Sequence, residues 1–125
     1  MQNLANSELA VMDLLWNAEQ MTAREIREEL YPDASKAQHG TVQRLLQRLM
    51  EKGFVYKDDS QYVHLFSARM NRQTYAGSQL ENLAEKLTEG SLTPMITHLI
   101  NEKKISNDEI SRIKTLLDQM EINND

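Results

Sequence analysis

Apolar residues recur every three to four positions in three segments of the first half of the chain. This spacing predicts three amphipathic helices, at about residues 8–18, 22–31 and 38–52. The second segment starts with Thr22 and Glu25, which have the spacing of a capping box at a helix N-terminus. Three short helices that follow one another closely are expected to pack their apolar faces into one small core.

After the third helix, the apolar period changes from 3.6 residues to two. Two alternating segments, 54–57 and 62–67, are separated by the polar residues 58–61, and this pattern predicts a β-hairpin. We expect Phe66 to pack on the third helix, whereas Tyr62 either packs there or stacks on a sugar. Three helices followed by a two-stranded hairpin is the order of elements in a winged helix-turn-helix, in which the hairpin is the wing.

Three further helices are predicted in the second half, at about 72–89, 93–102 and 106–120. Their apolar stripes are too large for so short a segment to bury alone, because small domains have a high ratio of surface to volume. We therefore expect a homodimer, in which the stripes of two copies meet. The predicted fold class is mainly α with a small β-hairpin wing: a winged-helix DNA-binding domain at 1–68 and a three-helix dimerisation domain at 69–125. The predicted dimerisation residues are Leu80, Leu83, Leu87, Met95, Ile96, Leu99, Ile113 and Leu117.

The net charge changes the picture only when its distribution is considered. The chain has 14 Lys and Arg residues against 19 Asp and Glu residues, a net charge of -5, which argues against a nucleic-acid partner. Between Lys36 and Lys57, however, five basic residues accompany a single acidic one, Glu51. A basic stripe on an acidic body orients a protein toward phosphate, because only the stripe is attracted.

One face of the third predicted helix is polar and rich in hydrogen-bond donors. Thr41, Arg44 and Arg48 recur there at helical spacing, opposite the apolar stripe. In the major groove of DNA, Arg pairs with guanine and Gln with adenine. An ordinary solvated helix face is the alternative, but the preceding two-helix turn, the wing and the basic stripe favour DNA. The predicted DNA-binding residues are Thr41, Gln43, Arg44, Gln47 and Arg48 for bases or phosphates, Gly40 for close backbone approach, and Lys36, Gln38, Lys57 and Gln61 for the DNA backbone.

Residues that catalysis or metal binding would need are sparse. The absence of cysteine excludes disulfides, thiolate metal sites and a cysteine nucleophile. The three histidines fall in different predicted elements without carboxylates at metal-ligand spacing, and there is no glycine-rich phosphate loop. We therefore expect no enzyme activity, cofactor or metal. No signal peptide or membrane-spanning run is recognisable, so the expected location is cytoplasmic.

Three stretches of the sequence resemble one known group of proteins. They are SELAVMDLLW at 7–16, TVQRLLQRLMEKGF at 41–54, and ISNDEI at 105–110 followed by Leu116 and Leu117. Over nearly its whole length the chain is similar to the penicillinase repressor family, which includes β-lactamase and methicillin-resistance regulators and copper-transport-operon repressors. This resemblance implies a bacterial winged-helix homodimer that represses transcription from a palindromic double-stranded DNA operator and leaves it on an inducer-linked signal.

The chain departs from this family in two places. Copper-responsive members carry Cys-x-Cys motifs near the C-terminus, so the lack of cysteine excludes copper sensing through thiolates. Antibiotic-responsive members are cut by a membrane sensor protease at an Asn-Phe bond in the fifth helix, and the matching positions here are His98 and Leu99. Release by such a protease and release by a small ligand or partner protein both stay open. The rival to a repressor is a winged-helix protein-interaction adaptor without specific DNA binding.

Overall fold

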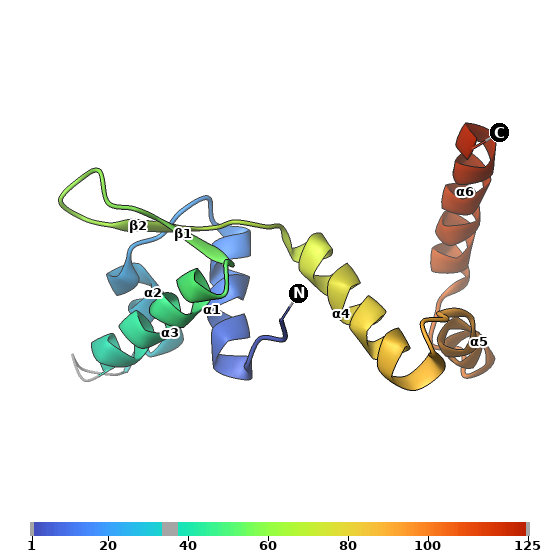
Figure 1. Ribbon diagram of the computed structural model, residues 1–125, viewed down its shortest axis with the longest axis horizontal. Helices are drawn as coiled ribbons and strands as arrows, with labels where there is room; N and C mark the ends of the chain where they lie inside the picture. Colours follow the sequence, from blue (N-terminus) through green and yellow to red (C-terminus); the bar gives the residue numbers. More distant parts are fainter. Residues whose placement is uncertain (1, 34–37, 125) are drawn as a thin grey trace. The chain divides into compact units, whose positions relative to one another are not determined.

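The computed structural model describes residues 2–33 and 38–124, with side chains described up to residue 121. Contacts within the chain divide it into two compact units, Met1–Gln79 and Leu80–Asp125. Helices and strands follow in the predicted order, so the predicted fold class is confirmed (Figure 1). The domain limits 1–68 and 69–125 stay a prediction about which parts fold independently. The elements are α1 (Asn6–Asn17), α2 (Ala23–Leu30), α3 (His39–Glu51), β1 (Val55–Asp58), β2 (Leu65–Ala68), α4 (Arg72–Thr88), α5 (Thr93–Asn101) and α6 (Asn107–Asn124).

Local sequence signals determine where the second helix begins and where the third helix ends. The Thr22 hydroxyl accepts the Glu25 backbone N–H at 3.1 Å, and the Glu25 carboxylate accepts the Thr22 N–H at 2.9 Å. These reciprocal bonds confirm the predicted capping box and lower the pKa of Glu25. At the end of α3, Gly53 follows the C-cap residue Lys52 with φ +83°, a conformation that glycine adopts without steric strain.

The core of the first unit lies between α1, α2, α3 and the hairpin, which are grouped together in Figure 1. Because the apolar stripe of α3 is turned into this core, the polar face of the same helix is turned outward. Tyr75 of α4 is also buried in it, so the first turn of α4 belongs to the winged unit. The buried apolar residues are Val11, Met12, Leu15, Met21, Ala23, Ile26, Val42, Leu45, Leu46, Leu49, Phe54, Val55, Phe66 and Tyr75.

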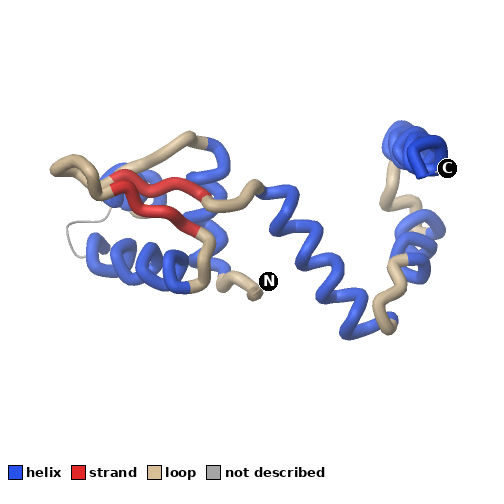
Figure 2. Tube along the Cα trace, turned by 45° about the horizontal axis from the view of Figure 1, so that its top comes forward, coloured by secondary structure: helices blue, strands red, loops and turns tan. Residues whose placement is uncertain are grey.

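The hairpin is joined to the helices through its second strand. The strands β1 and β2 pair antiparallel and lie side by side in Figure 2. Met21, between α1 and α2, forms an antiparallel bridge with Phe66, with N–H to oxygen bonds of 2.9 and 2.7 Å. The Phe66 side chain is 3% exposed and belongs to the same core as the apolar stripe of α3, whereas its direct packing on that helix stays a prediction.

The prediction for the second strand was wrong at its start. The alternating segment 62–67 was expected to pair along its whole length, but β2 begins at Leu65, opposite Asp58. The Asp58 carboxylate accepts the Ser60 N–H at 3.0 Å, which turns the chain and ends β1. Since no strand remains to pair with it, the segment before Leu65 is a loop, and the Tyr62 side chain in this loop is 99% exposed.

The second unit comprises the C-terminal part of α4 together with α5 and α6. Among its described residues, Ala84 is the only buried side chain. Large apolar side chains on all three helices keep exposed fractions between 36% and 69%. They are Leu80, Leu83, Leu87, Leu92, Ile96, Leu99, Ile100, Ile113, Leu116, Leu117 and Met120.

Candidate nucleic-acid interface

The helix α3 exposes one polar face along most of its length. Gln43, Arg44, Gln47 and Arg48 are exposed, opposite the buried apolar stripe. The Gln47 amide donates to the Glu51 carboxylate at 3.2 Å. The guanidinium groups of Arg44 and Arg48 form no hydrogen bond or ion pair within 4 Å with another described residue, so both are available to an external partner.

The N-terminal end of α3 is open to close approach. Gly40 is exposed, and among the described residues no heavy atom lies within 4 Å of the position that a Cβ would take there, apart from its chain neighbours and its own helix backbone. Thr41 and the N-cap residue Gln38 are half-buried beside it. These three predicted residues therefore lie together at the helix start, whereas the predicted contact Lys36 lies outside the described residues.

A groove of about 570 Å³ lies between α2, α3 and the hairpin. Three predicted residues line it, Gln43 and Gln47 from α3 and Lys57 from β1, while Gln61 is exposed in the hairpin loop. Several residues of this surface were missing from the predicted set because they come from separate elements that only the fold brings together. They are Arg24 of α2, His39, whose Nε2 lies 3.2 Å from the Gln43 amide nitrogen, and Tyr62 and His64 of the hairpin loop.

Lys52 does not belong to the exposed basic stripe, although its sequence position places it there. Its ammonium lies 2.8 Å from Glu8 Oε1 in α1, and the Glu8 side chain is 2% exposed. Burial raises the pKa of Glu8, but the hydrogen bond and charge of Lys52, the Ala5 N–H and the charge of Arg48 together lower it below its ordinary value of 4.5. Glu8 is therefore ionised at neutral pH, and the ion pair with Lys52 offsets its charge.

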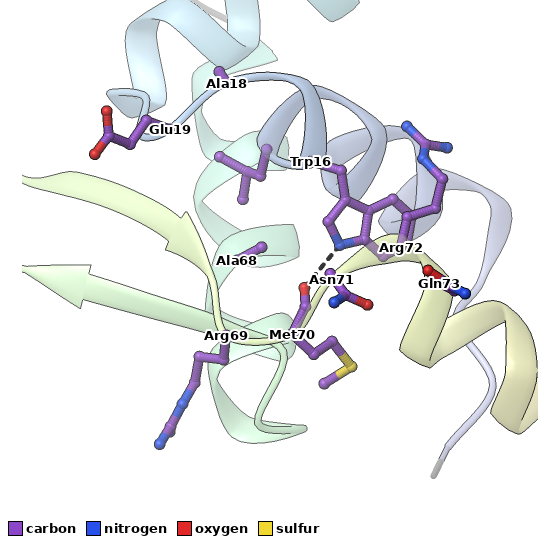
Figure 3. A pocket seen from close by; sticks show the side chains of 10 residues that line it. Trp16, Ala18, Glu19, Ala68, Arg69, Met70, Asn71, Arg72 and Gln73 are labelled. Carbon is purple, nitrogen blue, oxygen red and sulfur yellow. Dashed lines mark hydrogen bonds between the residues drawn. The ribbon is translucent and has the colours of Figure 1, made fainter. Parts of the chain in front are cut away.

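A second cavity, also of about 570 Å³, lies beside Trp16 where the chain enters α4 (Figure 3). The Trp16 indole N–H donates to the Met70 carbonyl at 3.0 Å, and the Arg72 guanidinium lies 4.9 Å from the Trp16 ring centre. Arg72 Nη1 also lies 2.7 Å from Asp13 Oδ1. These contacts attach the segment between β2 and α4 to α1, so this cavity lies at a structural junction and not on the α3 face.

In the second unit, an apolar cavity of about 540 Å³ lies between α4 and α5. Five predicted dimerisation residues line it: Leu80, Leu83, Met95, Ile96 and Leu99. The other three, Leu87, Ile113 and Leu117, are exposed on α4 and α6. His98 and Leu99, the positions that match the cleavage site of relatives, are exposed on α5.

Metal binding and membrane insertion find no support in the part of the chain that the structure describes. Over residues 2–33 and 38–124, no three His, Cys, Asp or Glu side chains are grouped so that they could hold a metal ion. Nor does any helix in these ranges combine the length and apolar composition needed to cross a bilayer.

Comparison with known proteins places the chain in a family. Residues 4–119 match the family described as Penicillinase repressor. The chain is 29% identical over 120 residues to the Transcriptional regulator BlaI of Mycobacterium tuberculosis, in both strain CDC 1551 / Oshkosh and strain ATCC 25618 / H37Rv, covering 94% of this chain and 85% of that protein. The solution structure of the DNA binding domain of the repressor BlaI aligns with a TM-score of 0.50 and 24% identity, over 60% of this chain and 94% of that one, which supports the winged-helix fold. The resemblance noted in the sequence is confirmed, and the chain belongs to the penicillinase repressor family, a family of transcription regulators and not of enzymes.

Proposed function

We propose that the protein is a sequence-specific transcriptional repressor that binds a palindromic DNA operator as a homodimer. The observation that carries this proposal is the exposed face of α3, where glutamine and arginine side chains project from a helix whose other face is fixed in the core. The relatives named above, a transcriptional regulator and the DNA binding domain of a repressor, support the same role. A repressor works where its DNA is, so a cytoplasmic location follows from this proposal.

In this proposal α3 enters the major groove. The guanidinium groups of Arg44 and Arg48 reach guanine or phosphate, and the amides of Gln43 and Gln47 reach adenine, because these are the pairings that the groove edges allow. Gly40, Gln38 and Thr41 at the start of the helix approach the phosphate backbone closely. Lys57 and Gln61 of the hairpin hold the backbone beside α3, and Lys36 is proposed for the same role from its sequence position alone. Arg24 and His64 line the groove beside α3 and extend this phosphate-facing surface.

The second unit is proposed to form the dimer. This unit leaves eleven large apolar side chains more than a third exposed, and only Ala84 is buried among its described residues. An apolar surface of this kind on a short helical unit is typical of an interface that a second copy covers. Two copies related by a two-fold axis would present two α3 helices to two half-sites, which is why the operator should be palindromic.

Release from DNA is proposed to act through loss of this dimer. A cut by a membrane sensor protease between His98 and Leu99 would separate α6 and the end of α5 from the rest of the chain. The base-reading residues would be untouched, but two half-sites could no longer be engaged together. A small ligand or partner protein that changes the separation of the two α3 helices would have the same result.

The function is tested by the salt dependence of DNA binding. Fluorescence anisotropy on a labelled duplex of mixed sequence should give a steep decrease in affinity with salt, with about -0.9 in log–log slope for each phosphate contact. Lys57→Gln, which removes a proposed backbone contact, should reduce this slope, whereas the matched control Lys114→Gln on α6 should leave it unchanged. Selection of duplexes from a random pool should then yield an inverted repeat. Almost no binding, or binding without salt dependence, would refute the repressor and favour the protein-interaction adaptor.

A further inference from the structure

Glu8 is the only charged side chain that is buried among the described residues. It lies in the first turn of α1, and one of its oxygens, Oε1, accepts two hydrogen bonds of 2.8 Å, from the Ala5 N–H and from the Lys52 ammonium. The other oxygen, Oε2, is buried without a hydrogen-bond partner among the described residues. Lys52 is therefore the one cation that compensates this buried charge directly.

The partner of Glu8 stands at the C-terminal end of α3. Lys52 is the C-cap residue of this helix, and its backbone N–H donates to the Arg48 carbonyl at 2.9 Å. Its side chain is 28% exposed and points to α1 through the 2.8 Å ion pair. The last turn of α3 is thus attached to the first turn of α1, and Arg48, which is exposed on α3, lies within the electrostatic influence of Glu8.

We propose that Glu8 is a positioning residue for the DNA-reading face, acting through Lys52, and that Lys52 itself makes no phosphate contact. The inference rests on the proposed function, and it specifies which cations of the basic stripe contact DNA. A phosphate that recruited Lys52 would have to take the ammonium from a carboxylate whose side chain is only 2% exposed. The exposed guanidinium groups of Arg44 and Arg48 can bind DNA without breaking such an ion pair.

The experiment compares two double variants that each remove one positive and one negative charge. Glu8→Gln with Lys52→Met leaves no charge buried, so the fold is retained more easily than in a single substitution. The matched control is Lys57→Gln with Asp59→Asn, which removes one positive charge, a proposed contact to the DNA backbone, and one negative charge from the hairpin. Salt slopes are measured on a duplex that the wild-type protein has selected from a random pool and on a mixed-sequence duplex of the same length, with circular dichroism to verify folding.

The slope of the Glu8/Lys52 double variant should equal that of the wild-type protein, whereas the control should lose about 0.9. An equal loss in both would show that Lys52 contacts phosphate and would overturn the inference. Wild-type protein that does not bind DNA would overturn the proposed function, and this inference with it.

Two single variants test the positioning role. Glu8→Gln should reduce the ratio of selected to mixed-sequence affinity by about tenfold, because the last turn of α3, which carries Arg48, is no longer attached to α1. Lys52→Arg, which can keep the ion pair, should retain the wild-type ratio; a role in stability alone would not produce this difference in a folded protein well below its unfolding temperature. An unchanged ratio in Glu8→Gln would overturn the positioning role.

Discussion

Removing either partner of the Glu8–Lys52 pair should destabilise the winged unit, but by very different amounts. The Glu8 side chain is 2% exposed and that of Lys52 is 28% exposed. Lys52→Met therefore leaves a carboxylate that cannot reach water and keeps only the Ala5 N–H. Glu8→Gln leaves the Lys52 ammonium, which can turn into solvent. The amide oxygen of the introduced glutamine can still accept the Ala5 N–H.

The expected magnitudes follow from these exposures. Lys52→Met should lower the free energy of unfolding by about 3 kcal/mol, the low end for one partner lost from a buried pair, because Lys52 is partly exposed. Glu8→Gln should cost about 1 kcal/mol, the usual value of one hydrogen bond. The free energy of unfolding of the double variant should be closer to that of Glu8→Gln than to that of Lys52→Met, because the double variant and Glu8→Gln both lack a buried charge.

The contribution of Glu8 to the stability of the fold should depend on pH. The pKa of Glu8 in the folded wild-type protein is below its ordinary value of 4.5, so this carboxylate stabilises the fold above about pH 4.5 and loses that contribution as the pH falls through the lowered pKa. In Lys52→Met, burial dominates and the pKa of Glu8 should rise above 4.5. The protonated form is then tolerated, so the stability difference between wild-type and variant should narrow from pH 7 to pH 4.

Urea unfolding followed by tryptophan fluorescence suits this measurement. Trp16 is the only tryptophan of the chain and lies on α1 in the winged unit, so its signal reports on that unit. Lys114→Met, an exposed lysine on α6, serves as control and should change nothing. A larger loss in Glu8→Gln than in Lys52→Met, or a difference that does not depend on pH, would refute the reasoning.

Three further predictions concern DNA binding and assembly. Arg44→Ala should weaken binding to the selected operator by about 1–3 kcal/mol in an anisotropy titration, and unchanged affinity would exclude Arg44 from base reading. Leu117→Asp should dissociate the dimer or unfold the second unit, because an unpaired charge in an apolar interface is costly; sedimentation of the wild-type protein as a monomer at micromolar concentration would contradict this. A chain truncated after Thr97 should bind the full operator no better than a single half-site, and affinity equal to that of the full chain would refute release by loss of bivalency.

The parts of the fold that depend on nearby residues could be predicted from the sequence. The apolar stripe of α3 follows from a spacing within one helix, and the capping box of α2 joins residues three positions apart. The polar face of α3 follows in the same way, because it is the complement of the buried stripe. Candidate residues such as Arg44 and Gln47 were therefore identified without knowledge of the tertiary structure.

Features that need two distant segments could not be predicted in this way. Glu8 and Lys52 are 44 positions apart, so no local spacing links them. Because both side chains are charged, a local pattern predicts that both are exposed to solvent. The alternation from Tyr62 onward has the pattern of a strand, but a strand also needs a partner, and β1 ends at Asp58. In both cases the missing information is which other segment lies opposite, which the local pattern does not contain.

The same apolar period has opposite outcomes in the two units. On α3, Leu46 and Leu49 are buried because α1, α2 and the hairpin cover them, whereas on α6 Ile113 and Leu117 stay 39% and 54% exposed. The period thus predicts which face needs an apolar partner, and the fold decides whether the chain supplies one. Where it does not, the proposed dimer would supply the missing hydrophobic contribution from a second copy, so folding of the second unit should be coupled to dimerisation and depend on protein concentration. Operator affinity should then fall on dilution below the dimer dissociation constant even though every DNA-facing side chain is intact.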